Sequence, residues 1–178
     1  KGRFSVRYVE KKGGVLVGFR EIDPRFVADL KSCDTLLPEL SQLIVPLANL
    51  INSTQAKQEI RQIEFIAGDG PIALVIRNFI TLPESDLALL REFELNNPVQ
   101  LYLQPGDIST VYPLNENPKL LSFHLEQHDI HFQFQPLDFI QVNAKINEAM
   151  IDLSLDLLQP NADDVILDLF CGLGNFTL

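Results

Sequence analysis

Cysteine is scarce in this chain, which has only Cys33 and Cys171 among its 178 residues. The two lie far apart in sequence and one falls inside a glycine turn, so they argue against a disulfide framework and for a reducing compartment. We therefore expect a cytoplasmic protein. No stretch of about 18 apolar residues indicates a transmembrane span. The first residues, Lys-Gly-Arg-Phe-Ser, do not have the pattern of a secretory signal.

Two phosphate-binding motifs are also absent from the glycine-containing segment near residue 170. A dinucleotide fingerprint, Gly-x-Gly-x-x-Gly, needs a third glycine, and the place counted from Gly172 is occupied by Thr177. A Walker loop needs Gly-Lys-Ser/Thr, which does not follow here. The segment therefore predicts neither a dinucleotide site nor a nucleoside triphosphate site.

What the segment does contain is an apolar run, an acid and a Gly-x-Gly turn. Residues 165–170 predict a short parallel strand buried on both faces, and Asp168 near its end can reach a ligand. Gly172 and Gly174 permit positive φ and a close approach of the backbone, and the N–H groups of a following helix would point at the same place. This pattern suits S-adenosylmethionine, which has an ammonium, a carboxylate and a ribose. The alternative is an ordinary strand-to-helix turn with Asp168 satisfied by backbone amides.

Strand and turn signals in the first two thirds of the chain predict an antiparallel α+β domain. Alternating apolar residues on either side of glycine turns indicate two hairpins, at residues 3–20 and 62–77. Helical spacing covers 36–51, where Pro46 should kink the helix or begin a second one. A second helix is expected over 83–93, because acids in its first turn suit the helix dipole. A short strand is expected over 100–103.

A third hairpin is predicted over residues 121–135, with a turn at 127–128. In this register every apolar pair falls on one face, which fixes the pairing strongly. The pairs on that face are Leu121–Phe134, Phe123–Phe132 and Leu125–Ile130. The same register places His124 opposite His131, but no cysteine or carboxylate is placed to complete a zinc site. We therefore favour paired surface histidines over a metal site.

The fold class expected from these patterns is α+β, with two domains of different architecture. Residues 1–135 are expected to form an antiparallel-sheet central domain. Residues 136–178 then begin an α/β Rossmann-like methyltransferase domain, with an amphipathic helix over 145–158. Pro136 marks the expected border. Because the second domain stops after its first glycine turn, we expect the chain to be an internal fragment of an enzyme.

Two segments together carry a resemblance to a known family. Residues 134–143, Phe-Gln-Pro-Leu-Asp-Phe-Ile-Gln-Val-Asn, are followed about 25 residues later by Leu-Asp-Leu-Phe-Cys-Gly-Leu-Gly-Asn-Phe at 167–176. This pair resembles the RNA uracil-5-methyltransferases, and most of all the bacterial iron–sulfur enzymes that methylate a uridine of 23S ribosomal RNA. Weaker support comes from residues 18–20 and 30–33.

The resemblance implies a set of residues that bind S-adenosylmethionine. In that family the glutamine of the Phe-Ile-Gln-Val-Asn segment contacts the cofactor, which here is Gln141. The aromatic residue after Leu-Asp-Leu and the asparagine after Gly-x-Gly correspond to Phe170 and Asn175. The cofactor-binding set predicted here is Gln141, Asp168, Phe170, Gly172, Gly174 and Asn175. The alternative for Gln141 is a side chain in the N-cap region of the next helix.

The family's reaction implies that the catalytic residues lie outside this chain. A cysteine thiolate adds to C6 of uracil, C5 then takes the methyl group, and a carboxylate base removes the C5 proton. In the family the nucleophile lies in a Ser-Cys-Asn-Pro segment further along, which does not occur here. Cys171 is inside the cofactor turn and is expected to be a small packing residue. We name no catalytic residue, and expect the chain alone to be inactive.

The resemblance gives Cys33 a metal-ligand role. In the iron–sulfur members a lone cysteine in such a segment is the fourth ligand of a 4Fe–4S cluster, and the other three come from an earlier cysteine group. That group is absent here, so we expect a cluster in the full-length protein but not in this chain. The alternative is a plain small buried residue.

The charge of the chain is unusual for an RNA enzyme. Its formal net charge is −10, although phosphate contacts need Lys and Arg. Residues 1–31 differ, with eight basic against four acidic side chains. RNA contact is therefore expected to start on the first hairpin; the alternative is a solvated edge strand on which lysine discourages aggregation.

The expected partner is 23S ribosomal RNA, with neither a membrane nor DNA, and the oligomeric state stays open. Two other functions are kept as alternatives. One is a tRNA uracil-5-methyltransferase, which Cys33 argues against. The other is a noncatalytic module that binds RNA or protein and has a vestigial glycine turn.

Overall fold

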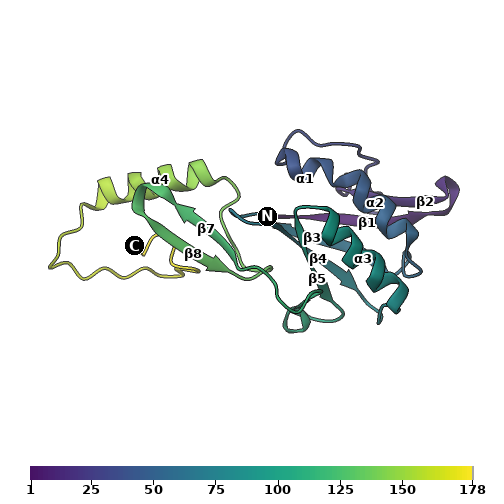
Figure 1. Ribbon diagram of the computed structural model, residues 1–178. Coiled ribbons are helices and arrows are strands. Elements are labelled where there is room, and N and C mark those ends of the chain that lie inside the picture. The colour runs from purple at the N-terminus through teal and green to yellow at the C-terminus, as the bar shows by residue number, and fades with distance from the viewer. Residues whose placement is uncertain (178) are drawn as a thin grey trace.

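The computed structural model describes residues 1–177, so Leu178 at the end of the predicted cofactor segment lies outside the described residues. Figure 1 shows a six-stranded sheet with helices on one face, followed by a separate two-stranded hairpin and a last helix. The first part contains β1 (Gly2–Val9), β2 (Gly14–Gly18), α1 (Pro38–Gln42), α2 (Ile44–Ser53), β3 (Ile60–Ile66), β4 (Ile72–Asn78), α3 (Glu84–Asn96), β5 (Val99–Gln104) and β6 (Tyr112–Pro113). The second contains β7 (Leu121–Leu125), β8 (Ile130–Phe134) and α4 (Ala144–Leu158).

The large sheet has the order β2-β1-β3-β4-β5-β6. Both hairpins expected in the first 77 residues are confirmed, as β1–β2 and β3–β4. The expected antiparallel character needs one correction, because β4 and β5 pair in parallel. A parallel neighbour requires a crossover connection, and α3 supplies it by returning the chain to the same end of the sheet. The architecture is a mixed α/β fold with a sheet rich in antiparallel pairs.

Pro46 lies near the start of α2, which explains how the segment 36–51 folds. The chain forms two short helices separated at Leu43, not one bent helix. Proline fits the first turn of a helix, where its missing N–H group has no partner to lose. The expectation that a second helix begins here is confirmed.

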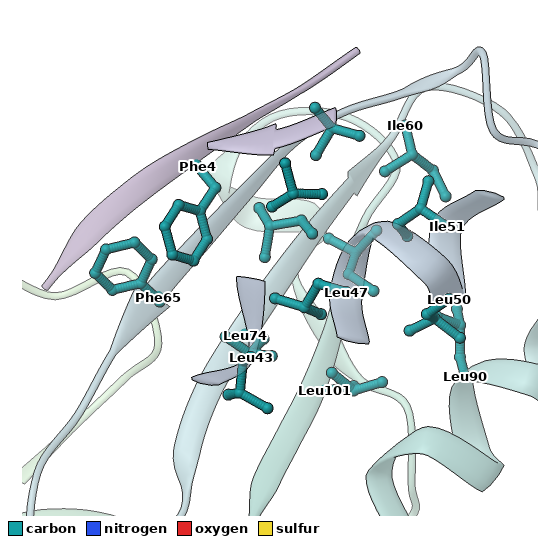
Figure 2. Close-up of a cluster of buried hydrophobic side chains, with 14 of the residues drawn as sticks. Phe4, Leu43, Leu47, Leu50, Ile51, Ile60, Phe65, Leu74, Leu90 and Leu101 are labelled. Atoms are coloured by element: carbon teal, nitrogen blue, oxygen red, sulfur yellow. The ribbon is translucent and has the colours of Figure 1, made fainter. Parts of the chain in front are cut away.

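The main core lies between the sheet and its helices. Figure 2 shows Leu47 and Ile51 of α2 above the inner face of the sheet, where Leu74 and Leu101 lie. All four of these side chains are completely buried. Alternation along the strands turns every second residue toward these helices and the residues between them toward the opposite face of the sheet.

The β7–β8 hairpin has the register that the sequence predicts, including the His124–His131 pair. Its single apolar face has two neighbours. Leu121 and Phe134 at one end pack against the outer face of the large sheet, while Leu125 and Phe132 at the other end pack against Ile151 of α4. The hairpin therefore joins the sheet to α4, and a border between domains at residue 136 stays a prediction.

Gly68 permits the close contact between the hairpin and the sheet. The backbone N–H of Asp69 donates to the carbonyl oxygen of Ser122 on β7 at 2.9 Å. A Cβ atom at Gly68 would collide with the same carbonyl oxygen. A side chain in this turn would push the hairpin away from the sheet.

The strand expected at residues 165–170 is wrong for this chain. The structure has no strand or helix between residues 159 and 177, and Val165 and Phe170 are fully exposed. A parallel strand obtains its backbone hydrogen bonds and its apolar contacts from neighbouring strands, and none is present beside this segment. Among residues 1–177, no helix has the length and apolar character that a membrane crossing requires.

Candidate cofactor-binding site

The segment before α4 is fixed to the start of β1. The Lys1 ammonium donates to the carbonyl oxygens of Leu137 and Asp138, the latter at 2.8 Å. Ile140 is buried against the outer face of the sheet. Gln141 follows as a half-buried residue. The site residue that the resemblance predicts therefore lies where the chain leaves the sheet and turns into α4.

Asn143, two residues after Gln141, caps α4. Its side-chain Oδ1 accepts a hydrogen bond from the Ile146 backbone N–H at 3.1 Å. Capping an otherwise unpaired N–H group is the usual role of asparagine at this position. Asn143 is therefore the capping residue. Gln141 lies two residues before it, in the N-cap region, and both interpretations of its side chain stay open.

The glycine turn adopts the backbone that its two glycines allow. Gly172 has φ 60° and Gly174 has φ 86°, both in the left-handed region. The Gly174 N–H donates to the Cys171 carbonyl at 2.9 Å, and the Thr177 N–H donates to the Gly174 carbonyl at 3.0 Å. At Gly172 no atom would contact an added Cβ, so positive φ and not crowding selects glycine there.

A pair of asparagines joins this turn to α4. Asn147 Nδ2 donates to Asn175 Oδ1 at 2.9 Å, and Asn175 Nδ2 donates back to Asn147 Oδ1 at 2.7 Å. Asn147 is buried, and each amide still has one N–H group free for another partner. Gln141 and Asn175 are 34 residues apart in sequence. The two hydrogen bonds to Asn147 nevertheless hold Asn175 against α4, the helix that starts shortly after Gln141.

Asp168 and Phe170 are not brought into an enclosed site. The Thr177 hydroxyl donates to Asp168 Oδ2 at 2.7 Å, and this carboxylate is not buried among backbone amides as the alternative required. Phe170 has φ 62°, a strained value for a residue other than glycine, and its ring is fully exposed. The six predicted residues have the amide, carboxylate and aromatic groups that suit S-adenosylmethionine. Of these, Asn175 is bonded to α4, whereas within residues 1–177 the Phe170 ring contacts nothing that would enclose it.

Cys33 lies at the edge of the main core and is half-buried, so it is not the fully buried residue of the alternative. Its backbone N–H donates to the Ser41 hydroxyl at 2.8 Å. Its sulfur lies 3.1 Å from the Thr35 hydroxyl oxygen. A hydroxyl that donates to the sulfur favours the thiolate, and it holds the pKa of Cys33 below its ordinary value.

The residues present do not fit a 4Fe–4S cluster. A cubane is held by four thiolates, whereas the chain has two cysteines in all. Cys171 is exposed, so its expected role as a packing residue is wrong. The expected packing partners of Cys171 belong to a parallel sheet that residues 159–177 do not form.

Free arginines gather on the outer face of the large sheet. Lys12 and Lys31 pair with Asp29 at 2.5 and 3.3 Å, and Arg25 pairs with Asp23 at 2.7 Å. Within residues 1–177, by contrast, no acidic side chain forms an ion pair with Arg7, Arg20 or Arg61. These three side chains line a surface hollow of about 640 Å³ together with Arg25.

Two of these features were missed from the sequence. Asn147 interrupts an apolar row that continues with Ile151 and Leu155, and a polar amide on such a face requires a hydrogen-bonding partner. Arg61 lies outside the basic N-terminal region and joins it only through the pairing of β3 with β1. The position of Asn147 in an apolar row is visible in the sequence. The position of Arg61 beside the basic N-terminal region is not, because it depends on the order of the strands in the sheet.

Comparison with known proteins finds sequences similar to this chain. Residues 115–178 match the family described as tRNA (Uracil-5-)-methyltransferase. Over all 178 residues the chain is 53% identical to the 23S rRNA (uracil(1939)-C(5))-methyltransferase RlmD of Stenotrophomonas maltophilia (strain K279a) and 51% identical to that of Xylella fastidiosa (strain 9a5c). The chain spans 40% of the length of each of these relatives.

A solved structure has the same fold. It is the tRNA (uracil-54, C5)-methyltransferase of Pyrococcus abyssi in complex with S-adenosyl-L-homocysteine, with a TM-score of 0.69 at 16% identity. The likeness covers 99% of this chain and 44% of that one. The resemblance to the RNA uracil-5-methyltransferases is thereby confirmed, and the chain is a relative of the 23S rRNA enzymes of that family over about 40% of their length.

Proposed function

We propose that the protein containing this chain transfers a methyl group from S-adenosylmethionine to C5 of a uridine in 23S ribosomal RNA. The observation that carries the proposal is the match over all 178 residues to enzymes named for that reaction. Over the aligned residues, the tRNA enzyme of similar fold is 16% identical to this chain, whereas the two 23S rRNA enzymes are 53% and 51% identical. The ribosomal substrate is therefore favoured over tRNA.

The cofactor would be held by the predicted set: Gln141, Asp168, Phe170, Gly172, Gly174 and Asn175. Amide groups suit the amino-acid part of S-adenosylmethionine, a flat aromatic ring suits adenine, and a carboxylate suits the ribose or the ammonium. When bound, the cofactor supplies an electrophilic methyl group. The Asn147–Asn175 pair supports this assignment, because it ties the glycine turn to the helix that follows Gln141. Closure of the pocket over Asp168 and Phe170 requires the remaining strands of a Rossmann-like sheet.

The RNA would lie on the outer face of the large sheet, in keeping with the division into an RNA-facing domain at 1–135 and a methyltransferase domain beginning at 136. Arg7, Arg20 and Arg61 are exposed and line one hollow. Guanidinium groups that have no acidic partner are available to phosphate oxygens. A local basic surface also explains how an acidic chain can approach RNA.

Two further parts of the proposal concern the cluster and the compartment. Cys33 would become a cluster ligand only where a longer chain brings three more thiolates to it. Its lowered pKa favours the thiolate that iron requires. A cytoplasmic location follows from a ribosomal RNA substrate in bacteria.

Calorimetry with S-adenosylmethionine on the full-length protein tests the proposal. We expect one binding site, weakened about tenfold or more by Gln141→Ala and by Asn175→Ala, since a hydrogen bond to a charged ligand contributes about 1.5 to 3 kcal/mol. The matched control is Gln133→Ala, an exposed glutamine on β8, which should leave binding unchanged. Absence of binding, or equal affinity in both site variants and the control, would contradict the proposal.

The variant Asn147→Ala separates contact from positioning. Asn147 holds Asn175 but is itself buried on α4. If Asn175 touches the cofactor, its loss should weaken binding more than the loss of Asn147. Equal effects would assign Asn175 a positioning role only.

A further inference from the structure

The solvent face of the β7–β8 hairpin carries a histidine pair with a neighbouring carboxylate. His124 and His131 are direct cross-strand partners, and their rings stack with centroids 3.9 Å apart and planes 3° from parallel. Asp129 ends the turn between the strands with φ 53°, in the left-handed region. Its Oδ1 lies 3.3 Å from His124 Nε2. The third ligand that the sequence did not place is therefore supplied by the turn.

The His124 ring has a polar atom without a hydrogen-bond partner. Its Nε2 is shielded from solvent and forms no aligned hydrogen bond within residues 1–177, although the Asp129 carboxylate is near. A polar nitrogen that has lost water and gained no hydrogen bond destabilises the folded state. A metal ion bound at this nitrogen would remove that cost, so the atom points to a ligand.

We propose that His124, His131 and Asp129 form a site for one divalent transition-metal ion of the zinc or nickel class. The ligand atoms of the three residues all lie within 4.8 Å of one another. Imidazole nitrogens and a carboxylate oxygen are a ligand set that these ions accept. Metal–ligand bonds of about 2.0 to 2.1 Å in a tetrahedral arrangement require ligand atoms roughly 3.3 Å apart, with water at the fourth position.

The required adjustment is a rotation of side chains. The Asp129 side chain is 94% exposed and His131 is exposed, so both can turn toward the ion without disturbing the core. The apolar partners of the hairpin, Phe123 and Phe132, lie on the opposite face. Binding would join the two strands at the end where the hairpin contacts α4.

The remaining histidine supplies a matched control. His128 Nε2 lies 2.9 Å from Asp152 Oδ1 on α4, so it is already paired on the other side of the turn. The chain has three histidines in all, and each one is in or beside this hairpin. Nickel is the better probe because it binds imidazole well. It also binds the two cysteine thiols less strongly than softer metal ions do.

Calorimetric titration of the metal-stripped chain with Ni²⁺ tests the site. We expect one ion per chain, with affinity reduced at least tenfold in His131→Ala and in Asp129→Asn, and unchanged in His128→Gln. His131 and Asp129 are exposed, so these variants should fold; circular dichroism checks this.

Two outcomes would overturn the site. One is the lack of stoichiometric binding at micromolar concentrations of the wild-type chain. The other is binding that survives in the double variant His131→Ala/Asp129→Asn, which would place the ion elsewhere. The outcome does not depend on methyl transfer, so it leaves the proposed function untouched.

Discussion

At the scale of single residues, the buried amide of Asn147 is the most informative polar group in the second part of the molecule. It occupies a place in an apolar row, and it forms two hydrogen bonds with Asn175 across a sequence separation of 28 residues. The position of Asn147 on a helix does not by itself indicate which residue is its hydrogen-bond partner. The sequence could have shown only that some partner is needed, because buried polar groups are nearly always paired.

Replacing Asn147 by alanine should release the glycine turn. The variant leaves one amide of the pair without its partner, which costs about 1 to 3 kcal/mol locally. Hydrogen exchange at the Gly174 and Thr177 amides should accelerate about fivefold or more. Asn96→Ala, at an exposed position near the end of α3, is the control and should not alter exchange there. Unchanged exchange in Asn147→Ala would mean that the pair does not hold the turn.

Thr35 should set the reactivity of Cys33. Because the hydroxyl donates to the sulfur and lowers the pKa of Cys33, its thiolate forms at a lower pH than that of an ordinary cysteine. In Thr35→Val the midpoint of the rate of alkylation against pH should move upward. The measurement uses iodoacetamide in a Cys171→Ser background, with Thr110→Val as a distant control. A midpoint that stays in place or moves downward would show that Thr35 does not stabilise the thiolate.

At the scale of elements, the single apolar face of the β7–β8 hairpin packs against the large sheet at one end and against α4 at the other. The sequence predicted its strands, its register and its inner face, because alternation fixes all three. It did not predict the neighbours, since any apolar surface could cover such a face. For the same reason the parallel pairing of β4 with β5 was missed: a short apolar strand fits either direction, and only the helical crossover decides.

Phe134→Ala should weaken the junction between the hairpin and the large sheet. This ring is 5% exposed and packs in the cluster with Ile66 and Tyr102, so its removal should lower the free energy of unfolding by about 3 to 5 kcal/mol. Phe139→Ala is a matched control, because that ring is 72% exposed and should cost under about 0.5 kcal/mol. Urea denaturation measures both. Equal effects would contradict the packing described for the hairpin.

The free arginines of the sheet should carry part of the RNA affinity. In full-length protein, Arg7→Ala and Arg20→Ala should weaken binding to a 23S rRNA segment, and each should reduce the slope of log affinity against log salt by about 1. Arg91 is the control because it pairs with Glu84 on α3, on the opposite face. Fluorescence anisotropy at several salt concentrations gives both quantities. A salt slope that Arg91→Ala changes as much as Arg7→Ala would remove the assignment of this face.

At the scale of the whole molecule, local patterns predicted most elements and few of their partners. Hairpins, helix starts and the positive φ of Gly172 and Gly174 follow from neighbouring residues, so they could be found in the sequence. The strand expected at 165–170 does not form here, because a parallel strand is stabilised by neighbouring strands that residues 1–177 do not supply. Of the candidate site residues, Asn175 is held against α4 by Asn147, and Gln141 lies just before the start of that helix.

Quantification of 5-methyluridine in ribosomal and transfer RNA, by mass spectrometry of cells without the full-length gene, tests the central claim most directly. The account predicts that one 5-methyluridine disappears from 23S rRNA and returns with the wild-type gene, whereas transfer RNA keeps its 5-methyluridine. Complementation with the Gln141→Ala variant should restore less of the modification. Unchanged 23S rRNA, or a loss confined to transfer RNA, would contradict the account.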